Sequence, residues 1–301
     1  MGLVSKAEAK KLKIQVMAEP VDIRGQELAG ALYNQFNDFH SRKIWDDPRI
    51  ENLLVKQRVY EMDNDGWFNS NGLVMFSPSS ASKCERELAL KAMKTTKDSK
   101  PMFPYQQRWV RNSSAVHEAV QRDLLYMTKK MEDPSFKVVF TPEGLPKWEK
   151  NNAQYKEFEH NGVKFAIAGM MDGQLIYTID KSIVGFEFKT KTNSVAQVGH
   201  YKMKDASEQH KEQCIAYSLL FGLEEFIIMY EAVAKDQWNK GEEARTDIRT
   251  FYVKVKEQDR IKLLDKFARV TKLVQADQLP ECEPDKCLFC EYKNVCGCKG
   301  V

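Results

Sequence analysis

A turn that carries an aspartate, followed by an apolar strand, constrains this chain more than any other feature. Asp172 lies in the turn, and the strand carries the triplet Glu187-Phe188-Lys189, so that the motif reads Asp-x₁₄-Glu-x-Lys. Successive side chains of a strand point to opposite faces. We therefore expect Glu187 and Lys189 to share one face, while Phe186 and Phe188 enter a core on the other.

The three polar residues of this motif predict a metal-dependent hydrolytic site. Mg²⁺ and Mn²⁺ prefer oxygen ligands, which Asp172 and Glu187 would supply. An ion held there could polarise a phosphoryl oxygen and provide a metal-bound hydroxide. Lys189 could stabilise the negative charge that develops during the reaction. The alternative is a solvated edge strand on which the triplet has no function.

Two later features favour the catalytic interpretation. His117, on a predicted amphipathic helix, could add an imidazole ligand, although a single histidine on such a helix is more often structural. Gln213 and Tyr217 are four residues apart on the helix after the strand, so they share one helix face and could touch the lysine or the substrate. The alternative for this pair is a surface glutamine and a half-buried tyrosine.

The hydrophobic pattern predicts a mixed α/β core with a central sheet flanked by helices. The expected strands cover residues 137–141, 163–168, 174–178, 183–189, 225–232 and 248–255. The expected helices cover residues 6–17, 26–39, 47–62, 106–131, 208–220 and 257–276, and a further helix opens at Ser77-Pro78, with Cys84 one turn inside it.

Composition limits the class of protein. The chain has 301 residues, 43% of them hydrophobic and 30% charged, which is ordinary for a globular protein. No apolar run approaches the roughly 18 residues needed to span a bilayer, and the first residues lack the apolar core of a signal peptide. We therefore expect a cytoplasmic protein that does not act in a membrane.

A basic segment with aromatic residues favours a nucleic-acid partner. Residues 83–111 contain eight lysines or arginines against three acidic residues, with Phe103, Tyr105 and Trp109 among them. Basic groups interleaved with aromatic rings suit a nucleic-acid backbone with unstacked bases. The alternative is a solvated helix face followed by a loop.

Five of the seven cysteines fall in the last twenty residues. In a reducing compartment such a cluster indicates a metal rather than disulfides. Cys287, Cys290 and Cys296 supply three thiolates, and a four-ligand site needs a fourth. Cys282 or Cys298 would complete a zinc knuckle, whereas Cys84 would join the site from 203 residues upstream.

Together, these motifs resemble the RecB-like branch of the PD-(D/E)XK nuclease superfamily. The resemblance implies a restriction-endonuclease-like core in which His117, Asp172 and Glu187 bind Mg²⁺ or Mn²⁺. It further implies that Lys189 is catalytic and that Gln213 and Tyr217 support the site and substrate. Two positions depart from the usual pattern: Ser113 replaces a glycine before the histidine, and Met171 replaces a proline before the aspartate.

The cysteines resemble a subgroup of that branch that includes the CRISPR-associated RecB-like exonuclease and AddB-type nuclease domains. There a [4Fe–4S] cluster is held by one upstream cysteine and a Cys-x₂-Cys-x₅-Cys motif. The resemblance implies a cluster on four cysteines: Cys84, Cys287, Cys290 and Cys296. Such a cluster would act as a structural clasp, with Cys282 and Cys298 as spare thiols and Cys214 as a small core residue.

The resemblance spans about residues 76–298 and implies a nuclease domain over residues 76–301, with residues 1–75 as a helical accessory extension. It implies a DNA exonuclease acting on single strands or duplex ends, in recombination, repair, replication or spacer processing, and it admits a phage origin. Helicase, recombination or CRISPR partner proteins and a homo-oligomer are compatible with it. Two alternatives stay open: a non-catalytic nucleic-acid-binding subunit on the same fold, and a zinc-knuckle binding protein.

Overall fold

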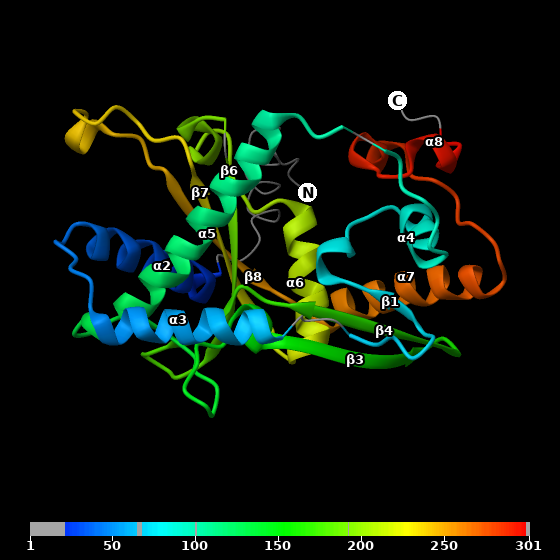
Figure 1. Ribbon diagram of the computed structural model, residues 1–301, viewed down its shortest axis with the longest axis horizontal. Helices are drawn as coiled ribbons and strands as arrows, with labels where there is room; N and C mark the ends of the chain where they lie inside the picture. The colour runs from blue at the N-terminus through cyan, green and yellow to red at the C-terminus, as the bar shows by residue number, and fades with distance from the viewer. Residues whose placement is uncertain (1–21, 65–67, 100, 192, 299–301) are drawn as a thin grey trace, which may run out of the picture.

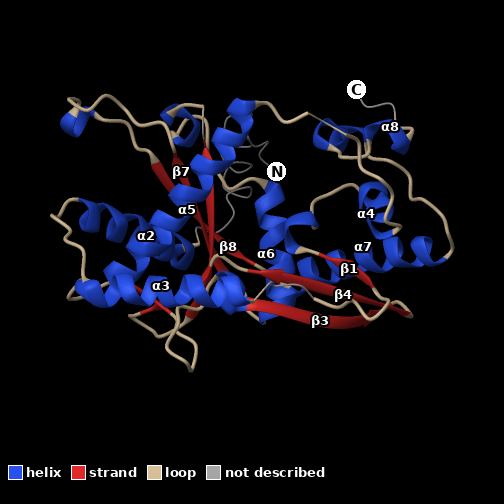
Figure 2. Ribbon diagram, in the orientation of Figure 1, coloured by secondary structure: helices blue, strands red, loops and turns tan. Residues whose placement is uncertain are grey.

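The computed structural model describes residues 22–64, 68–99, 101–191 and 193–298. Within these ranges two β-sheets are flanked by helices, which confirms the predicted mixed α/β architecture (Figures 1 and 2). The expected helix over residues 6–17 lies outside the described residues.

The larger sheet carries the Glu-x-Lys strand in its centre. Its five strands run in the order β2-β5-β6-β7-β8, and only β6 and β7 are parallel. Their bounds are β2 Phe136–Val138, β5 Gly173–Tyr177, β6 Ile183–Lys191, β7 Glu225–Ala232 and β8 Ile248–Lys254. These five strands were predicted, with ends that differ by no more than three residues.

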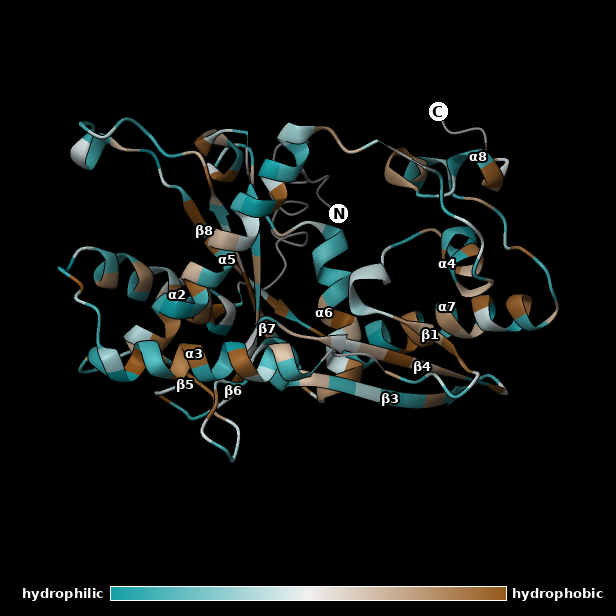
Figure 3. Cartoon of the chain, viewed as in Figure 1, coloured by the Kyte–Doolittle hydropathy of each residue, from teal (hydrophilic) through white to brown (hydrophobic). Residues whose placement is uncertain are grey.

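The smaller sheet was only partly predicted. It has the order β1-β4-β3, with β1 Val74–Phe76, β3 Ala153–His160 and β4 Val163–Met170. Only β4 was expected. β1 has three residues, and β3 is half exposed and carries four charged or histidine side chains among its eight residues, so neither shows a clear apolar pattern. In Figure 3, β4 is more strongly hydrophobic than β3.

The single central sheet of the prediction is thus divided in two. β4 runs directly into β5, and only Met171 and Asp172 lie between them. The chain bends there because Asp172 does not continue the backbone ladder; its side-chain Oδ2 instead accepts a hydrogen bond from the Phe188 N–H of β6, at 2.8 Å.

Most of the predicted helices are present. The helices are α2 Ile23–His40, α3 Pro48–Asp63, α4 Glu85–Ala92, α5 Pro104–Lys130, α6 Glu208–Phe221, α7 Glu257–Gln275 and α8 Lys293–Cys296. None of those in the described part of the chain combines the length and the apolar character that crossing a membrane requires.

The helix expected to open at Ser77 is shorter than predicted. Pro78–Ser80 form a single 3₁₀ turn, and α4 begins only at Glu85. Cys84 therefore lies at the N-cap of α4 and not one turn inside a helix. The Ser80 hydroxyl donates back to the Ser77 carbonyl at 2.8 Å within this turn.

Residues of the predicted accessory extension belong to the main core. Leu28, Leu32 and Phe36 of α2 are fully buried and pack in one cluster with Phe186 and Phe188 of β6. This burial confirms that the two phenylalanines enter a core. The division of the chain at residue 75 stays a prediction.

Candidate active site

The β5–β6 hairpin explains the spacing between Asp172 and Glu187. Its register pairs Gly173 with Phe186, so the residue before Gly173 lies opposite the residue after Phe186. The hydrogen bond from the Phe188 N–H then holds the Asp172 carboxylate against β6. The fourteen residues between Asp172 and Glu187 therefore form the paired part of one hairpin and its connecting turn. This hairpin brings the two acids together.

Glu187 and Lys189 form the expected pair on one face of β6. Their side chains are in direct ionic contact, and Glu187 is only 1% exposed. Gln213 of α6 donates to Glu187 Oε1 at 2.8 Å and to the Tyr217 hydroxyl at 2.9 Å. The Tyr217 hydroxyl in turn donates to the Met170 carbonyl at 2.9 Å.

This chain of hydrogen bonds gives the Gln-x₃-Tyr pair a clear structural role. Because Gln213 and Tyr217 are one turn apart on α6, one amide group can hold both the Glu187 carboxylate and the phenol. Tyr217 then fixes the backbone two residues before Asp172. The pair is therefore buried beside the acidic residues and not on the surface. Cys214, between the two, is fully buried in the core, as expected.

His117 reaches the same site from α5, together with an acid that the sequence analysis did not identify. His117 Nε2 lies 3.8 Å from Asp172 Oδ2 and 3.4 Å from Glu149 Oε1. One donor atom from each of His117, Glu149 and Asp172 lies within 4.8 Å of the other two, a spacing that allows one metal ion to bind all three. Gln121, one turn after His117, donates to Glu149 Oε1 at 3.3 Å and to the Asp172 carbonyl at 3.2 Å.

No motif or hydrophobic pattern in the sequence predicted a role for Glu149. It opens the 3₁₀ turn Glu149–Asn152 between two strands, with a positive φ of 47°. It lies in no motif, and acids in short turns are common on protein surfaces. The buried Trp148 before it and the hydrogen bond from the Glu149 N–H to the Met171 carbonyl, at 3.1 Å, place it here.

Burial dominates the electrostatics of the acids at the site. Burial, and then the neighbouring Asp172 charge, raise the pKa of Glu187 to about 7. Burial also raises the pKa of Asp172 and of Glu149. Burial alone would lower the pKa of Lys189, but the charges of Glu187 and Asp172 outweigh it and raise that pKa.

Two buried atoms indicate where a cation would fit. Among the described residues, neither His117 Nε2 nor Glu187 Oε2 has a hydrogen-bond partner. Buried polar atoms almost always have one. Burial lowers the pKa of His117, which favours the neutral ring, the form that can donate a lone pair to a metal. An open pocket of about 300 Å³, lined by His117, Glu149 and Met170 among others, gives access to this side of the site.

The cysteines predicted to form the clasp lie close together. Cys84, Cys287, Cys290 and Cys296 are all buried, and the Glu283 N–H donates to the Cys84 sulfur at 3.4 Å. Burial, and then the nearby Cys296 and Cys84, raise the pKa of Cys287. In Figure 1, α8 lies above α4 at the same end of the molecule. The fold therefore brings the upstream cysteine to the C-terminal three.

The prediction that Cys282 and Cys298 are spare thiols is wrong. The two are joined in a disulfide, with Cα atoms 6.0 Å apart. The physical reason is the left-handed Gly297 (φ 66°), which ends α8 and turns Cys298 back toward Cys282. The Cys298 sulfur also lies 3.1 Å from the Cys287 sulfur.

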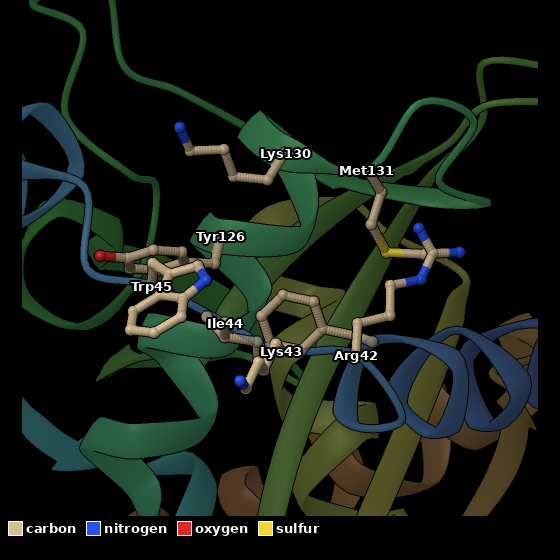
Figure 4. A pocket seen from close by; sticks show the side chains of 8 residues that line it. Arg42, Lys43, Ile44, Trp45, Tyr126, Lys130 and Met131 are labelled. Atoms are coloured by element: carbon tan, nitrogen blue, oxygen red, sulfur yellow. The ribbon is translucent and has the colours of Figure 1, made fainter.

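A second pocket, of about 270 Å³, lies near the other end of α5 (Figure 4). It is lined by Phe39, Arg42, Lys43, Ile44, Trp45, Tyr126, Lys130 and Met131. None of these side chains is a carboxylate, so this pocket lacks the hard-cation ligands of the site around Asp172.

Comparison with known proteins leaves the family open. No protein-family model matches the sequence, and no curated protein matches it. Similar solved structures include SSO0001, at 14% identity and a TM-score of 0.45, over 83% of this chain and 97% of that one. Another is the alkaline exonuclease LHK-Exo from Laribacter hongkongensis, at 8% identity and a TM-score of 0.39, over 68% of this chain and 90% of that one. Similarities this low do not assign a function to this chain.

Proposed function

We propose that this protein is a Mg²⁺- or Mn²⁺-dependent deoxyribonuclease that hydrolyses phosphodiester bonds at single-stranded DNA or duplex ends. The observation that carries the proposal is the convergence of His117, Glu149 and Asp172 beside the buried Glu187–Lys189 pair. A cluster of acids with raised pKa values and one lysine is the composition expected of a divalent-metal hydrolase.

The residues divide into metal ligands, a catalytic cation and supporting groups. His117, Asp172 and Glu187 would bind the ion, with Glu149 as an additional carboxylate. A bound Mg²⁺ or Mn²⁺ would polarise a phosphoryl oxygen and lower the pKa of a coordinated water. Lys189, held by Glu187, would stabilise the extra negative charge of the transition state. Gln213 and Tyr217 keep Glu187 and the Met170–Asp172 backbone in position.

We further propose that Cys84, Cys287, Cys290 and Cys296 bind a [4Fe–4S] cluster. Their burial, the small core shared by Cys290 and Cys296, and the contact of Cys84 with Glu283 near the C-terminal cysteines support this assignment. The cysteines have no contact with the Asp172 site among the hydrogen bonds of the described residues, which favours a structural role for the cluster.

The activity is tested with end-labelled single-stranded and blunt duplex DNA over a titration of MnCl₂. Lys189→Ala should reduce the cleavage rate by about 10²–10³-fold, because it removes one group that stabilises the transition state. Lys254→Ala is the matched control, since Lys254 is an exposed lysine near the end of β8. An unchanged rate in Lys189→Ala would overturn the assigned site.

The same assay separates the alternatives. DNA binding without cleavage at any Mn²⁺ concentration would indicate a non-catalytic binding subunit. Anaerobic purification tests which metal the cysteines bind. A colourless protein with stoichiometric zinc and no iron would overturn the [4Fe–4S] assignment and favour a zinc knuckle.

A further inference from the structure

The N-cap and first turns of α5 carry three aromatic side chains that are about half exposed. Phe103, Tyr105 and Trp109 are 54%, 49% and 48% exposed, although large aromatic residues usually contribute to a core. Figure 1 shows this end of α5 rising above the sheets. We call Phe103, Tyr105 and Trp109 the aromatic stripe.

The three rings contact one another. Phe103 and Tyr105 are nearly parallel, with centroids 6.0 Å apart and planes at 8°, and Tyr105 meets Trp109 edge to face at 5.4 Å. These contacts hold the side chains in a defined arrangement in which each residue stays about half exposed to solvent. Ordered, exposed ring faces are what unpaired bases stack on.

The charge around the stripe is positive. Residues 99–117 contain Lys100, Arg108 and Arg111 and no aspartate or glutamate; the next acid along the chain is Glu118. Arg108 and Arg111 are exposed on the same turns of α5 as Trp109. A phosphate backbone would therefore meet cations, and no carboxylate of this segment would repel it.

The stripe leads to the candidate metal site along one helix. Tyr105, Trp109, Ser113 and His117 are four residues apart, so they follow a line that winds slowly around α5. Ser113 contacts Thr190 at the end of β6, Oγ to Oγ1 at 3.0 Å, and His117 is the candidate ligand. Eight residues of helix, about 12 Å, separate Trp109 from His117.

We infer that the aromatic stripe is a stacking platform for single-stranded DNA and that it delivers an unpaired end to the site at Asp172. Duplex DNA fits less well, because its bases already stack on one another and do not present free faces. The second part of the inference, delivery of the DNA end to the site at Asp172, rests on the proposed function. Binding itself can be measured without cleavage.

The test measures the affinity of the full-length protein, in EDTA, for fluorescently labelled oligo(dT) and for a blunt duplex of the same length. Trp109→Ala should weaken oligo(dT) binding roughly five- to hundredfold, the range expected for the loss of one stacked base. Trp109→Phe should keep most of the affinity, since it keeps a ring face. Duplex binding should change little.

Trp238→Ala is the matched control, because Trp238 is also fully exposed but lies in the loop between β7 and β8. It should bind both DNAs like the wild type. Equal affinity of Trp109→Ala and wild type for oligo(dT) would overturn the inference, as would an equal loss for the duplex. If Trp109→Ala loses binding while the wild type cleaves nothing with Mn²⁺, the platform stands and the proposed nuclease function fails.

Discussion

At the scale of single residues, the site is defined by three neighbouring carboxylates with raised pKa values and one lysine, Lys189. Glu187 is almost fully buried, and Lys189 is the cation that touches it. Glu149 and Asp172 lie nearby and also have raised pKa values. A bound divalent cation would favour the ionised form of these acids and so lower their pKa values.

This arrangement predicts a pH-dependent stability. The pKa of Glu187 rises from its ordinary value of 4.5 to about 7 on folding. The stabilising contribution of Glu187 to the free energy of unfolding is therefore fully present below about pH 4.5 and is lost as the pH rises through 7. The thermal midpoint in EDTA should fall over this window. Saturating Mn²⁺ should reduce the fall, which differential scanning fluorimetry at a series of pH values would measure.

Glu149→Gln provides the matched variant for that experiment. It removes one of the acids with a raised pKa while keeping the shape of the side chain. We expect a smaller fall of the thermal midpoint with pH in EDTA and a smaller gain from Mn²⁺ than in the wild type. An identical Mn²⁺ gain in the two proteins would show that Glu149 does not contact the ion.

At the scale of elements, the site depends on a close approach between β4 and the 3₁₀ turn Pro78–Ser80. Gly169 precedes the bend at Asp172, and a Cβ built on it would lie 2.5 Å from Pro78 Cδ. Glycine is needed here for space, because a ring held in a turn cannot move away as a flexible side chain could.

Gly169→Ala should therefore destabilise the protein by about 1–3 kcal/mol through overpacking. It should also lower the proposed nuclease activity, because the displaced backbone carries Met170 and Asp172. Urea unfolding followed by circular dichroism measures the first effect. Gly30→Ala is the control: its Cβ meets nothing within 4 Å, and alanine within α2 should stabilise by up to about 1 kcal/mol. Equal stability of the two variants would contradict the role given to Gly169.

The elements themselves were predictable where one face is continuously apolar. β6 and β7 are buried along most of their length, and α6 and α7 end where the sequence indicates. β3 was not predictable, because it is an edge strand whose stability comes from pairing with β4 over its whole length. Such pairing leaves little trace in the local sequence.

At the scale of the whole molecule, the fold brings the start of α4 to the C-terminal cysteines. Cys290 and Cys296 pack with Leu90 of α4 and with Tyr292 in a small core of their own. The Asp98 N–H also donates to the Glu291 carbonyl at 2.8 Å. A cross-link between such distant segments restricts the unfolded chain and so stabilises the folded one.

If the four cysteines hold an iron–sulfur cluster, Cys84→Ser should lose most of the bound iron and lower the thermal midpoint. Iron content and the visible absorbance of anaerobically purified protein provide the measurement. The double variant Cys282→Ser, Cys298→Ser should keep its iron, because these two form a disulfide and are not ligands. Iron retained in Cys84→Ser but lost in the double variant would reverse the ligand assignment.

The sequence by itself determined the groups whose positions follow from local geometry. Glu187 and Lys189 share a face because a strand alternates, and Gln213 and Tyr217 share a face because a helix turns every 3.6 residues. Only the tertiary structure decided the partners that come from elsewhere in the chain: Glu149 from a short turn, the bend at Asp172 that divides the sheet, and the disulfide that Gly297 directs. These depend on contacts between segments distant in the chain, and no local periodicity encodes such contacts.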